Sequence, residues 1–378
     1  MKGGALMKRF LCLLGTLVLL TSLCATALAE DVVCGEYTYK LKENSGASSE
    51  KYRYTPALTG YTGTAETLVL PAELDGHIIR RVDDSAFWTN ETLRSVTIPE
   101  GYYDIGAKAF GNCAALEEVR LPDSLTSIAW SAFQNCENLR EIVFPEGLIQ
   151  LEIDAFLNTA LETVHIPASM FVLENAFTDC ESLREITVSP ENPYLYAQAN
   201  VVFDHTGSLL IYPGGREGDS YAVPEGVIEI NPYAFKGAQL SSVSLPDSIR
   251  KIWRYAFSAT GLTSFTLPGS VAEMPEQMLS FCASLETVTV EEGVKSLGND
   301  VFLACERLAS VTLPSTLTAI GGGAFWGCKA LPELVIPASV TSIGKNCFQF
   351  CPNLVLVVAP GSYAEQYAIE NEILYRAE

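Results

Sequence analysis

The dipeptide Ala-Phe recurs through the chain at a nearly constant spacing. Its first four phenylalanines stand at steps of 23 residues, each after an alanine: Phe87, Phe110, Phe133 and Phe156. The pattern continues at Ala176-Phe177, pauses, and resumes at Phe235, Phe257, Leu279, Phe302, Phe325 and Phe348. A fixed period in the twenties is typical of stacked supersecondary units. The chain is therefore expected to fold as a solenoid.

Each repeat combines a strand, a proline, a second apolar stretch and the Ala-Phe segment. In the unit that ends at Cys136, the alternation of Val119 and Leu121 predicts a strand with one buried face. Pro122 ends this strand, because proline has no N–H to donate to a ladder. The stretch 125–128 is also expected to be extended. The Ala-Phe-x-x-Cys segment is expected to close the coil as a helical or 3₁₀ turn.

The combination of Leu-x-x-Val-x-Ile-Pro, Leu-Thr-Ser-Ile-Gly and Ala-Phe-x-x-Cys resembles the BspA-like leucine-rich repeats of bacterial surface and secreted proteins. The stretches 60–63, 70–76 and 360–368 resemble that family's first unit and its ending, so the resemblance covers roughly residues 36–378. It implies an α/β solenoid, a curved right-handed stack of about 11–12 coils with a parallel sheet on one face and short helical or 3₁₀ turns on the other. It also implies adhesion or protein binding, with no catalytic residues.

The domain organisation follows from where the repeats begin and end. Residues 1–29 read as a secretory signal peptide, with basic Lys8 and Arg9, an apolar run and an Ala-Leu-Ala cleavage site. That run is shorter than a membrane span requires. The further segments are an N-terminal cap (30–64), a first repeat block (65–189), a hairpin-like insert (190–222), a second block (223–359) and a C-terminal cap (360–378). We expect a secreted or extracellular monomer, able to associate with a cell surface without inserting into the membrane.

Charge and motifs exclude several classes of function. The chain carries 24 basic and 45 acidic residues, and a formal net charge of −21 repels nucleic acid. No His-Glu-x-x-His, nucleophile elbow, Walker loop or glycine-rich dinucleotide turn is present in the sequence. We therefore expect no enzyme activity, no cofactor and no metal site.

Seven cysteines share one repeat column: Cys113, Cys136, Cys180, Cys282, Cys305, Cys328 and Cys351. The same column elsewhere holds Asn90, Thr159, Ala238 and Thr260, which indicates a packing position for small side chains. Disulfides and a metal site are the alternatives. Stacked side chains point in parallel, which is poor disulfide geometry. Cys34 lies outside this column, and its role is open.

The candidate binding site is the outward face of the first-block strands. In the second block the outward positions are mostly serine and threonine, whereas the first block carries more individual side chains there. The candidate residues are Glu118, Arg120, Glu141, Val143 and His165 on the sheet, with Tyr102 and Tyr103 on nearby turns. Exposed aromatic residues and arginine are frequent at interface hot spots. The alternative is that the charges pair across strands and the tyrosines pack under turns.

These observations favour a non-catalytic secreted or surface protein that mediates adhesion or binds a protein or a glycan. The alternative is a structural surface protein that associates with copies of itself.

Overall fold

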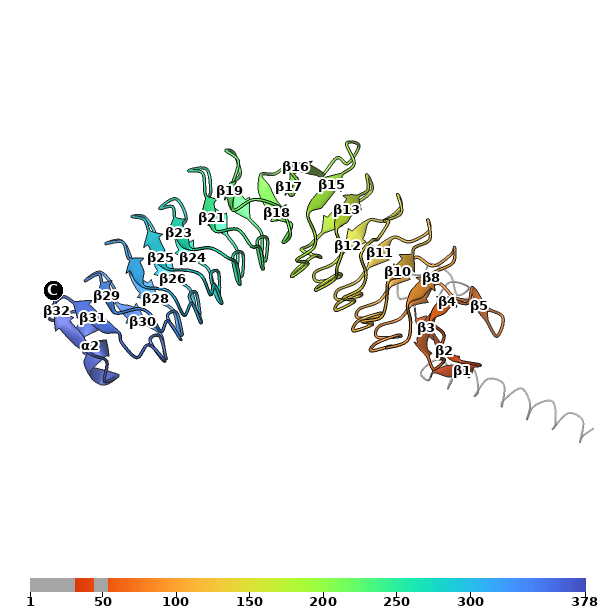
Figure 1. The fold of residues 1–378 in the computed structure, drawn as a ribbon, viewed down its shortest axis with the longest axis horizontal. Helices are drawn as coiled ribbons and strands as arrows, with labels where there is room; N and C mark the ends of the chain where they lie inside the picture. The colour runs from red at the N-terminus through yellow and green to blue at the C-terminus, as the bar shows by residue number, and fades with distance from the viewer. Residues whose placement is uncertain (1–30, 44–53) are drawn as a thin grey trace, which may run out of the picture.

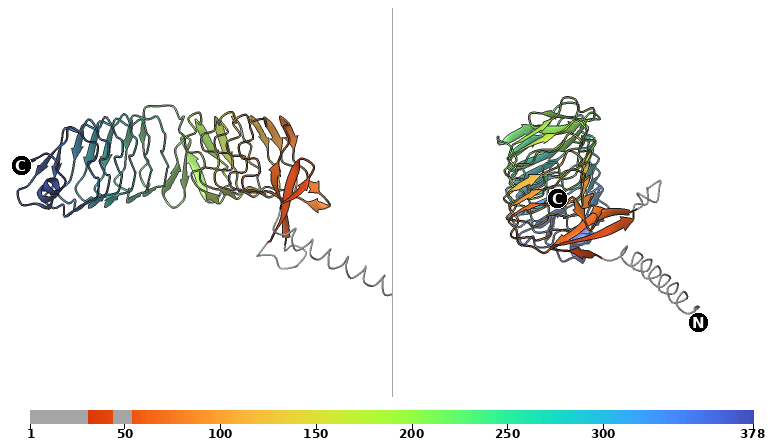
Figure 2. Two further views of the ribbon diagram at one scale, coloured as in Figure 1. Left: turned by 90° about the horizontal axis from the view of Figure 1, so that it is seen from below. Right: turned by 90° about the vertical axis from the view of Figure 1, so that its right-hand side faces the viewer.

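The computed structural model describes residues 31–43 and 54–378, which form a curved solenoid of about 14 turns (Figure 1). The expected leucine-rich repeat stack is confirmed, with more turns than the 11–12 coils expected. The expected signal peptide, residues 1–29, lies outside the described residues. Seen along the stack, the coils superpose and the N-terminal strands lean to one side (Figure 2). Three faces run along the solenoid: a long-strand face, a short-strand face and a turn face.

The long-strand face is built from the Leu-x-x-Val-x-Ile segments, in parallel register between most neighbouring coils. Val96 and Val119, for example, are aligned partners with their side chains in the core. The strands are β4 (Thr67–Val69), β8 (Ser95–Thr97), β10 (Glu118–Arg120), β13 (Thr163–Ile166), β15 (Glu185–Val188), β19 (Ser220–Ala222), β21 (Ser242–Ser244), β23 (Ser264–Leu267), β25 (Thr287–Val290), β27 (Ser310–Thr312), β29 (Glu333–Ile336) and β31 (Val355–Val358).

The short-strand face is formed by the second apolar stretch of each coil, which is extended as expected. Its residues alternate between an outward side chain and a buried one, as in Ser127 and Ile128. The strands are β7 (Arg81–Val82), β9 (Asp104–Ile105), β11 (Ser127–Ile128), β12 (Gln150–Leu151), β14 (Val172–Leu173), β18 (Ser208–Ile211), β20 (Glu229–Ile230), β22 (Lys251–Ile252), β24 (Glu273–Met274), β26 (Ser296–Leu297), β28 (Ala319–Ile320) and β30 (Ser342–Ile343).

The turn face differs from the expected helical or 3₁₀ turn. Its backbone makes successive turns, with Ala109 N–H donating to the carbonyl of Gly106 and Cys113 N–H to that of Phe110. In the same coil, Lys108 and Asn112 have left-handed φ values of 57° and 59°. A left-handed residue on each side of Ala-Phe turns the chain too sharply for a helix to propagate. This face is therefore a stack of turns.

The phenylalanines of the Ala-Phe segments form an aromatic spine in the core. The Phe133 ring lies 5.2 Å from that of Phe110 and 5.1 Å from that of Phe156, and both pairs are nearly parallel. In the insert, Tyr212 takes the corresponding place, 4.8 Å from Phe235. The spine of the second block thus begins inside the insert, where the sequence repeat is lost.

The insert joins two hydrophobic cores. β16 (Leu195–Gln198), β17 (Val201–Asp204) and β18 form an antiparallel meander, which confirms the hairpin expected between the two apolar runs. Val202 and Leu210 pack into the first-block core, whereas Phe203 and Leu209 pack into the second-block core. The meander therefore contributes buried side chains to both cores. It lies where the arch of Figure 1 bends.

The two ends of the stack are covered. At the N-terminus, β1 (Val32–Cys34), β2 (Tyr37–Glu43) and β3 (Tyr54–Tyr61) pair in antiparallel order, followed by the small hairpin of β5 (Glu73–Leu74) and β6 (His77–Ile78). At the C-terminus lie helix α2 (Tyr363–Glu370) and β32 (Tyr375–Ala377). The Ser362 side chain accepts a hydrogen bond from Glu365 N–H and caps the expected helix. None of the described helices is long and apolar enough to span a membrane.

The shared cysteine column lies beneath the turn face and has a common bonding pattern. The thiol of Cys113 donates to the carbonyl of Phe87, 3.1 Å away in the preceding coil, and Cys136 does the same to Phe110 at 3.2 Å. All seven cysteines of the column make this bond to the spine residue of the preceding coil. The nine described cysteines are free thiols. The column thus supports the stack by hydrogen bonding and packing.

The buried thiols are expected to resist alkylation in the native protein. Burial raises the pKa of Cys113 and of Cys180 to about 11, so both remain protonated at pH 8, and the side chains are inaccessible as well. Iodoacetamide followed by peptide mass mapping should label Cys34 in the folded protein. All nine described cysteines should react in urea without reductant. Peptides recovered as disulfide pairs before reduction would contradict the free-thiol assignment.

Candidate functional site

Four of the predicted candidates, on two neighbouring coils, point outward on the long-strand face as expected. Glu118 and Arg120 flank the buried Val119 in β10 and point outward. In the next coil, Glu141 and Val143 flank the buried Ile142 and are also exposed, with Val143 at 72% of its full accessible surface. An apolar side chain with such exposure in a sheet is an unusual feature, and it draws attention to this part of the face.

A groove of about 530 Å³ separates these two pairs of side chains. The segment 140–145 is not paired as a strand, so the sheet that ends at β10 is interrupted before β13. Phe144 fills a core position that Leu121 and Ile166 hold in other coils, with its ring 5.7 Å from Phe156. The larger ring gives a physical reason for the locally irregular coil. The groove is lined by Glu117, Glu118, Val119, Arg120, Leu121, Asp123, Glu141, Ile142, Val143 and Pro145.

The groove is acidic, because its one arginine is already engaged. Arg120 Nε donates to Glu118 Oε1 at 2.8 Å, and Ser95 Oγ donates to the other carboxylate oxygen at 3.0 Å. The hydrogen bond from Arg120 lowers the pKa of Glu118, so this carboxylate stays charged. Within the described residues, the carboxylates of Glu141 and Asp123 have no ion-pair partner. The groove therefore offers apolar walls together with uncompensated negative charge.

The remaining candidates fall in three different places. His165 is exposed in β13, where its Nδ1 lies 2.8 Å from Thr187 Oγ1, but it does not line the groove. Tyr102 is fully buried, and its hydroxyl donates to the carbonyl of Pro71 at 2.7 Å. It therefore packs under the turn and offers no surface to a ligand. Tyr103 is 38% exposed, at the corner between the two strand faces.

Tyr103 belongs to an apolar stripe that sequence reasoning missed. Corner residues of successive coils are linked through backbone hydrogen bonds, from Ile149 N–H to Thr126 and from Phe171 N–H to Ile149. The Phe171 ring then meets the Tyr194 ring edge-on at 4.7 Å. We call the exposed side chains Tyr103, Ile149, Phe171 and Tyr194 the corner stripe, which the polar Thr126 interrupts between Tyr103 and Ile149. The sequence did contain a signal for this stripe, because many second-block coils carry polar residues at the corner position. These include Arg250, Lys295, Thr318 and Thr341.

The corner stripe and the groove are neighbouring parts of one surface. Thr126 and Ile149, in successive coils of the corner, follow the groove residues Asp123 and Pro145 by three and four positions. Among residues 31–43 and 54–378, no group of three or more histidine, cysteine or acidic side chains is arranged to hold a metal ion. This surface has the features of a binding site: exposed apolar contacts beside fixed charges.

Comparison with known proteins identifies a family of repeats. The profile of the BspA type leucine-rich repeat region matches in six copies over residues 76–184 and 228–355, together more than half of the chain. The search of curated proteins finds no match.

Similar solved structures share the fold over most of its length. A leucine-rich cell surface protein from Faecalibacterium prausnitzii is 25% identical, with a TM-score of 0.59 over 85% of this chain and 98% of that one. The pneumococcal vaccine antigen PcpA is 19% identical, with a TM-score of 0.70 over 93% and 99%. A leucine-rich repeat protein from Eubacterium ventriosum is 20% identical, with a TM-score of 0.66 over 85% and 95%. The last two show likeness of fold alone.

Proposed function

The chain belongs to the BspA type leucine-rich repeat family, and from this we propose that it is a non-catalytic secreted or cell-surface protein that binds another protein. The extracellular location is supported by the family and by the similarity to the Faecalibacterium cell surface protein. The observation that carries the binding proposal is the acidic groove at Val143 beside the corner stripe. Together they form an apolar surface with a charged rim, as in protein interfaces.

The chemistry of the groove defines the partner. Val143 and Ile142 offer an apolar contact to an inserted aliphatic or aromatic side chain. The free carboxylates of Glu141 and Asp123 attract lysine or arginine beside it. The partner is therefore a protein surface that carries an apolar anchor flanked by basic residues. A second copy of this chain fits poorly, because two chains that each carry a formal net charge of −21 repel each other.

A charge introduced at Val143 is expected to weaken partner binding at least tenfold, or about 1.4 kcal/mol. The Val143→Glu variant places a carboxylate where the apolar anchor would lie, while the exposed position leaves the core intact. A photoreactive phenylalanine analogue at position 143 first captures the partner from the protein's own environment. Isothermal titration calorimetry with that purified partner then measures the change in affinity.

Val335 provides a matched control. It is exposed at the same strand position in β29, two residues after a glutamate, as Val143 follows Glu141. Val335→Glu should leave the affinity unchanged, and the photoreactive group at 335 should capture little of the same partner. Equal capture at the two positions, or equal loss in the two variants, would contradict the proposal. Ordered oligomers of the chain in light scattering would favour self-association instead.

A further inference from the structure

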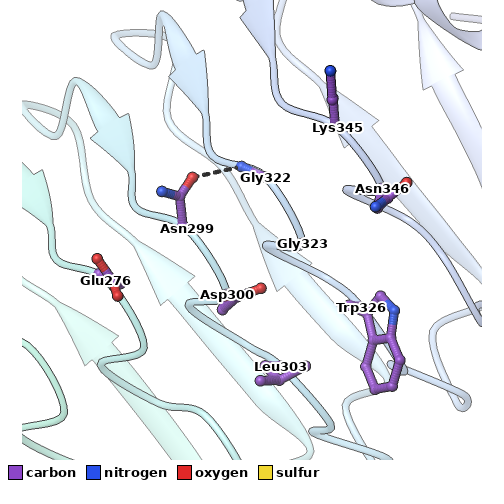
Figure 3. Close-up of a pocket in the computed structure, with 9 residues that line it drawn as sticks. All are labelled: Glu276, Asn299, Asp300, Leu303, Gly322, Gly323, Trp326, Lys345 and Asn346. Carbon is purple, nitrogen blue, oxygen red and sulfur yellow. Dashed lines mark hydrogen bonds between the residues drawn. The ribbon is translucent and has the colours of Figure 1, made fainter.

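The turn face of the second block contains a hollow of about 430 Å³ (Figure 3). It lies many coils away from the groove. Its floor is Gly322 and Gly323. Asp300 and Asn346 hold the position of Gly323 in the two neighbouring coils, and all three have left-handed φ values. A Cβ on Gly323 would lie only 2.1 Å from Asp300 Oδ1. The hollow thus exists because one coil lacks the side chain that its neighbours carry.

One wall of the hollow is an oriented tryptophan. Trp326 Nε1 donates to Gln349 Oε1 at 3.2 Å, and the indole meets the Phe350 ring edge-on at 5.0 Å. Leu303 of the preceding coil also lines the hollow. These contacts fix the indole in place before any ligand arrives, which lowers the entropic cost of binding.

The other walls carry hydrogen-bonding groups of both kinds. Asn299 Oδ1 accepts from Gly322 N–H at 2.8 Å, as the dashed line in Figure 3 shows. Within the described part of the chain, the side chains of Asp300, Asn346 and Lys345 have no hydrogen-bond or ion-pair partner. In Figure 3, Asp300 and Asn346 stand on opposite sides of Gly323. The site therefore presents amide, ammonium and carboxylate groups around an aromatic wall.

We propose that this hollow binds a neutral carbohydrate. A sugar ring presents C–H groups on its faces, which pack on an indole, and hydroxyls around its edge that both donate and accept hydrogen bonds. The hollow offers complementary groups of both kinds. A cationic side chain would use only the hydrogen-bond acceptors of the hollow, and the ammonium group of Lys345 would repel it. An anion would be opposed by Asp300 and Glu276.

The ligand is an oligosaccharide, because a second hollow of about 430 Å³ adjoins the first. Glu276 lines both hollows, and the second also contains Met274 and Trp253. Trp253 Nε1 donates to Glu229 Oε1 at 2.7 Å, which fixes this indole as well. A short sugar chain can therefore extend from Trp326 across Glu276 towards Trp253.

The four tryptophans of the chain allow a direct test by nuclear magnetic resonance. The ¹⁵N-labelled indole groups are followed during titration with neutral tetrasaccharides of glucose, mannose, galactose and N-acetylglucosamine, up to about 10 mM. At least one tetrasaccharide should shift the Trp326 signal saturably and the Trp253 signal with it, whereas the monosaccharide of the same sugar should shift Trp326 alone. Trp88 and Trp130 in the first block serve as internal references. Absence of a Trp326 shift with every saccharide would overturn the proposal.

Two variants localise the binding and use residues that neighbouring coils already carry. In Gly323→Asn the Asp300 carboxylate must turn aside, because the new Cβ would lie 2.1 Å from its Oδ1. Gly323→Asn fills the hollow with the side chain that Asn346 already carries at the same position and φ. Trp326→Leu introduces the residue found at the corresponding position of the preceding coil, Leu303. Each should weaken binding of the responding saccharide at least tenfold, whereas Trp130→Leu should not. Unchanged affinity in Gly323→Asn, or tighter binding of acetyl-arginine amide than of any saccharide, would refute the assignment.

Discussion

Replacing Phe133 by alanine is expected to lower the free energy of unfolding of the central first-block coils by about 3–5 kcal/mol. The ring is fully buried and stacked between Phe110 and Phe156, so its removal leaves a cavity with an unsupported ring on each side. In a repeat stack each coil contacts only its neighbours. Native-state hydrogen exchange should therefore show faster exchange in the adjacent coils before any change near Phe325.

The control for this prediction is Phe133→Leu. Leu279 occupies a spine position and is fully buried, which shows that the stack accepts leucine there. The leucine variant should lose much less stability than the alanine variant, since it retains most of the buried volume. Uniform acceleration of exchange through all the coils of Phe133→Ala would contradict nearest-neighbour coupling.

The second large effect is expected in the hairpin that joins the two cores. Phe203→Ala should destabilise the first coils of the second block by about 3–5 kcal/mol, because the Phe203 ring packs into that core. Val202→Ala should cause a smaller loss of stability. This loss should fall in the first block, because Val202 packs into the first-block core. Hydrogen exchange resolved by peptide mass spectrometry separates the two responses.

The comparison is informative because the two residues are adjacent in sequence. Any general weakening of β17 would affect both blocks equally in both variants. We therefore expect the fast-exchanging peptides to lie in the second block for Phe203→Ala and in the first block for Val202→Ala. If both variants loosened the same block, the assignment of the two sides of the meander to separate cores would be wrong.

The spacing of the repeat was sufficient to predict most of the fold. Columns such as Val96 and Val119 must align between coils, because a slip of one residue would expose the buried set. The turn face was predicted less well. Lys108 and Asn112 adopt left-handed conformations that no pattern of apolar residues reveals, and the expected helical turn therefore does not form.

The candidate site was predictable only in part. The alternation places Glu118, Arg120 and Val143 outward, and the structure agrees. The groove between them depends on a missing pairing in one coil, which is a property of packing between coils and leaves no motif. Tyr102 illustrates the same limit: only the three-dimensional position of the Pro71 carbonyl explains why this tyrosine is buried.

The meander between the two cores also bears on how the protein can vary in length. Its buried side chains pack into both cores, through Leu210 towards one core and Leu209 towards the other. A coil duplicated or deleted elsewhere in either block would leave these contacts unchanged. The junction thus allows coils of different length in one stack. Coils of 21 and 22 residues lie beside it, and they need not have the same length as the 23-residue coils farther away. Homologues should accordingly differ in coil number on each side while retaining this junction.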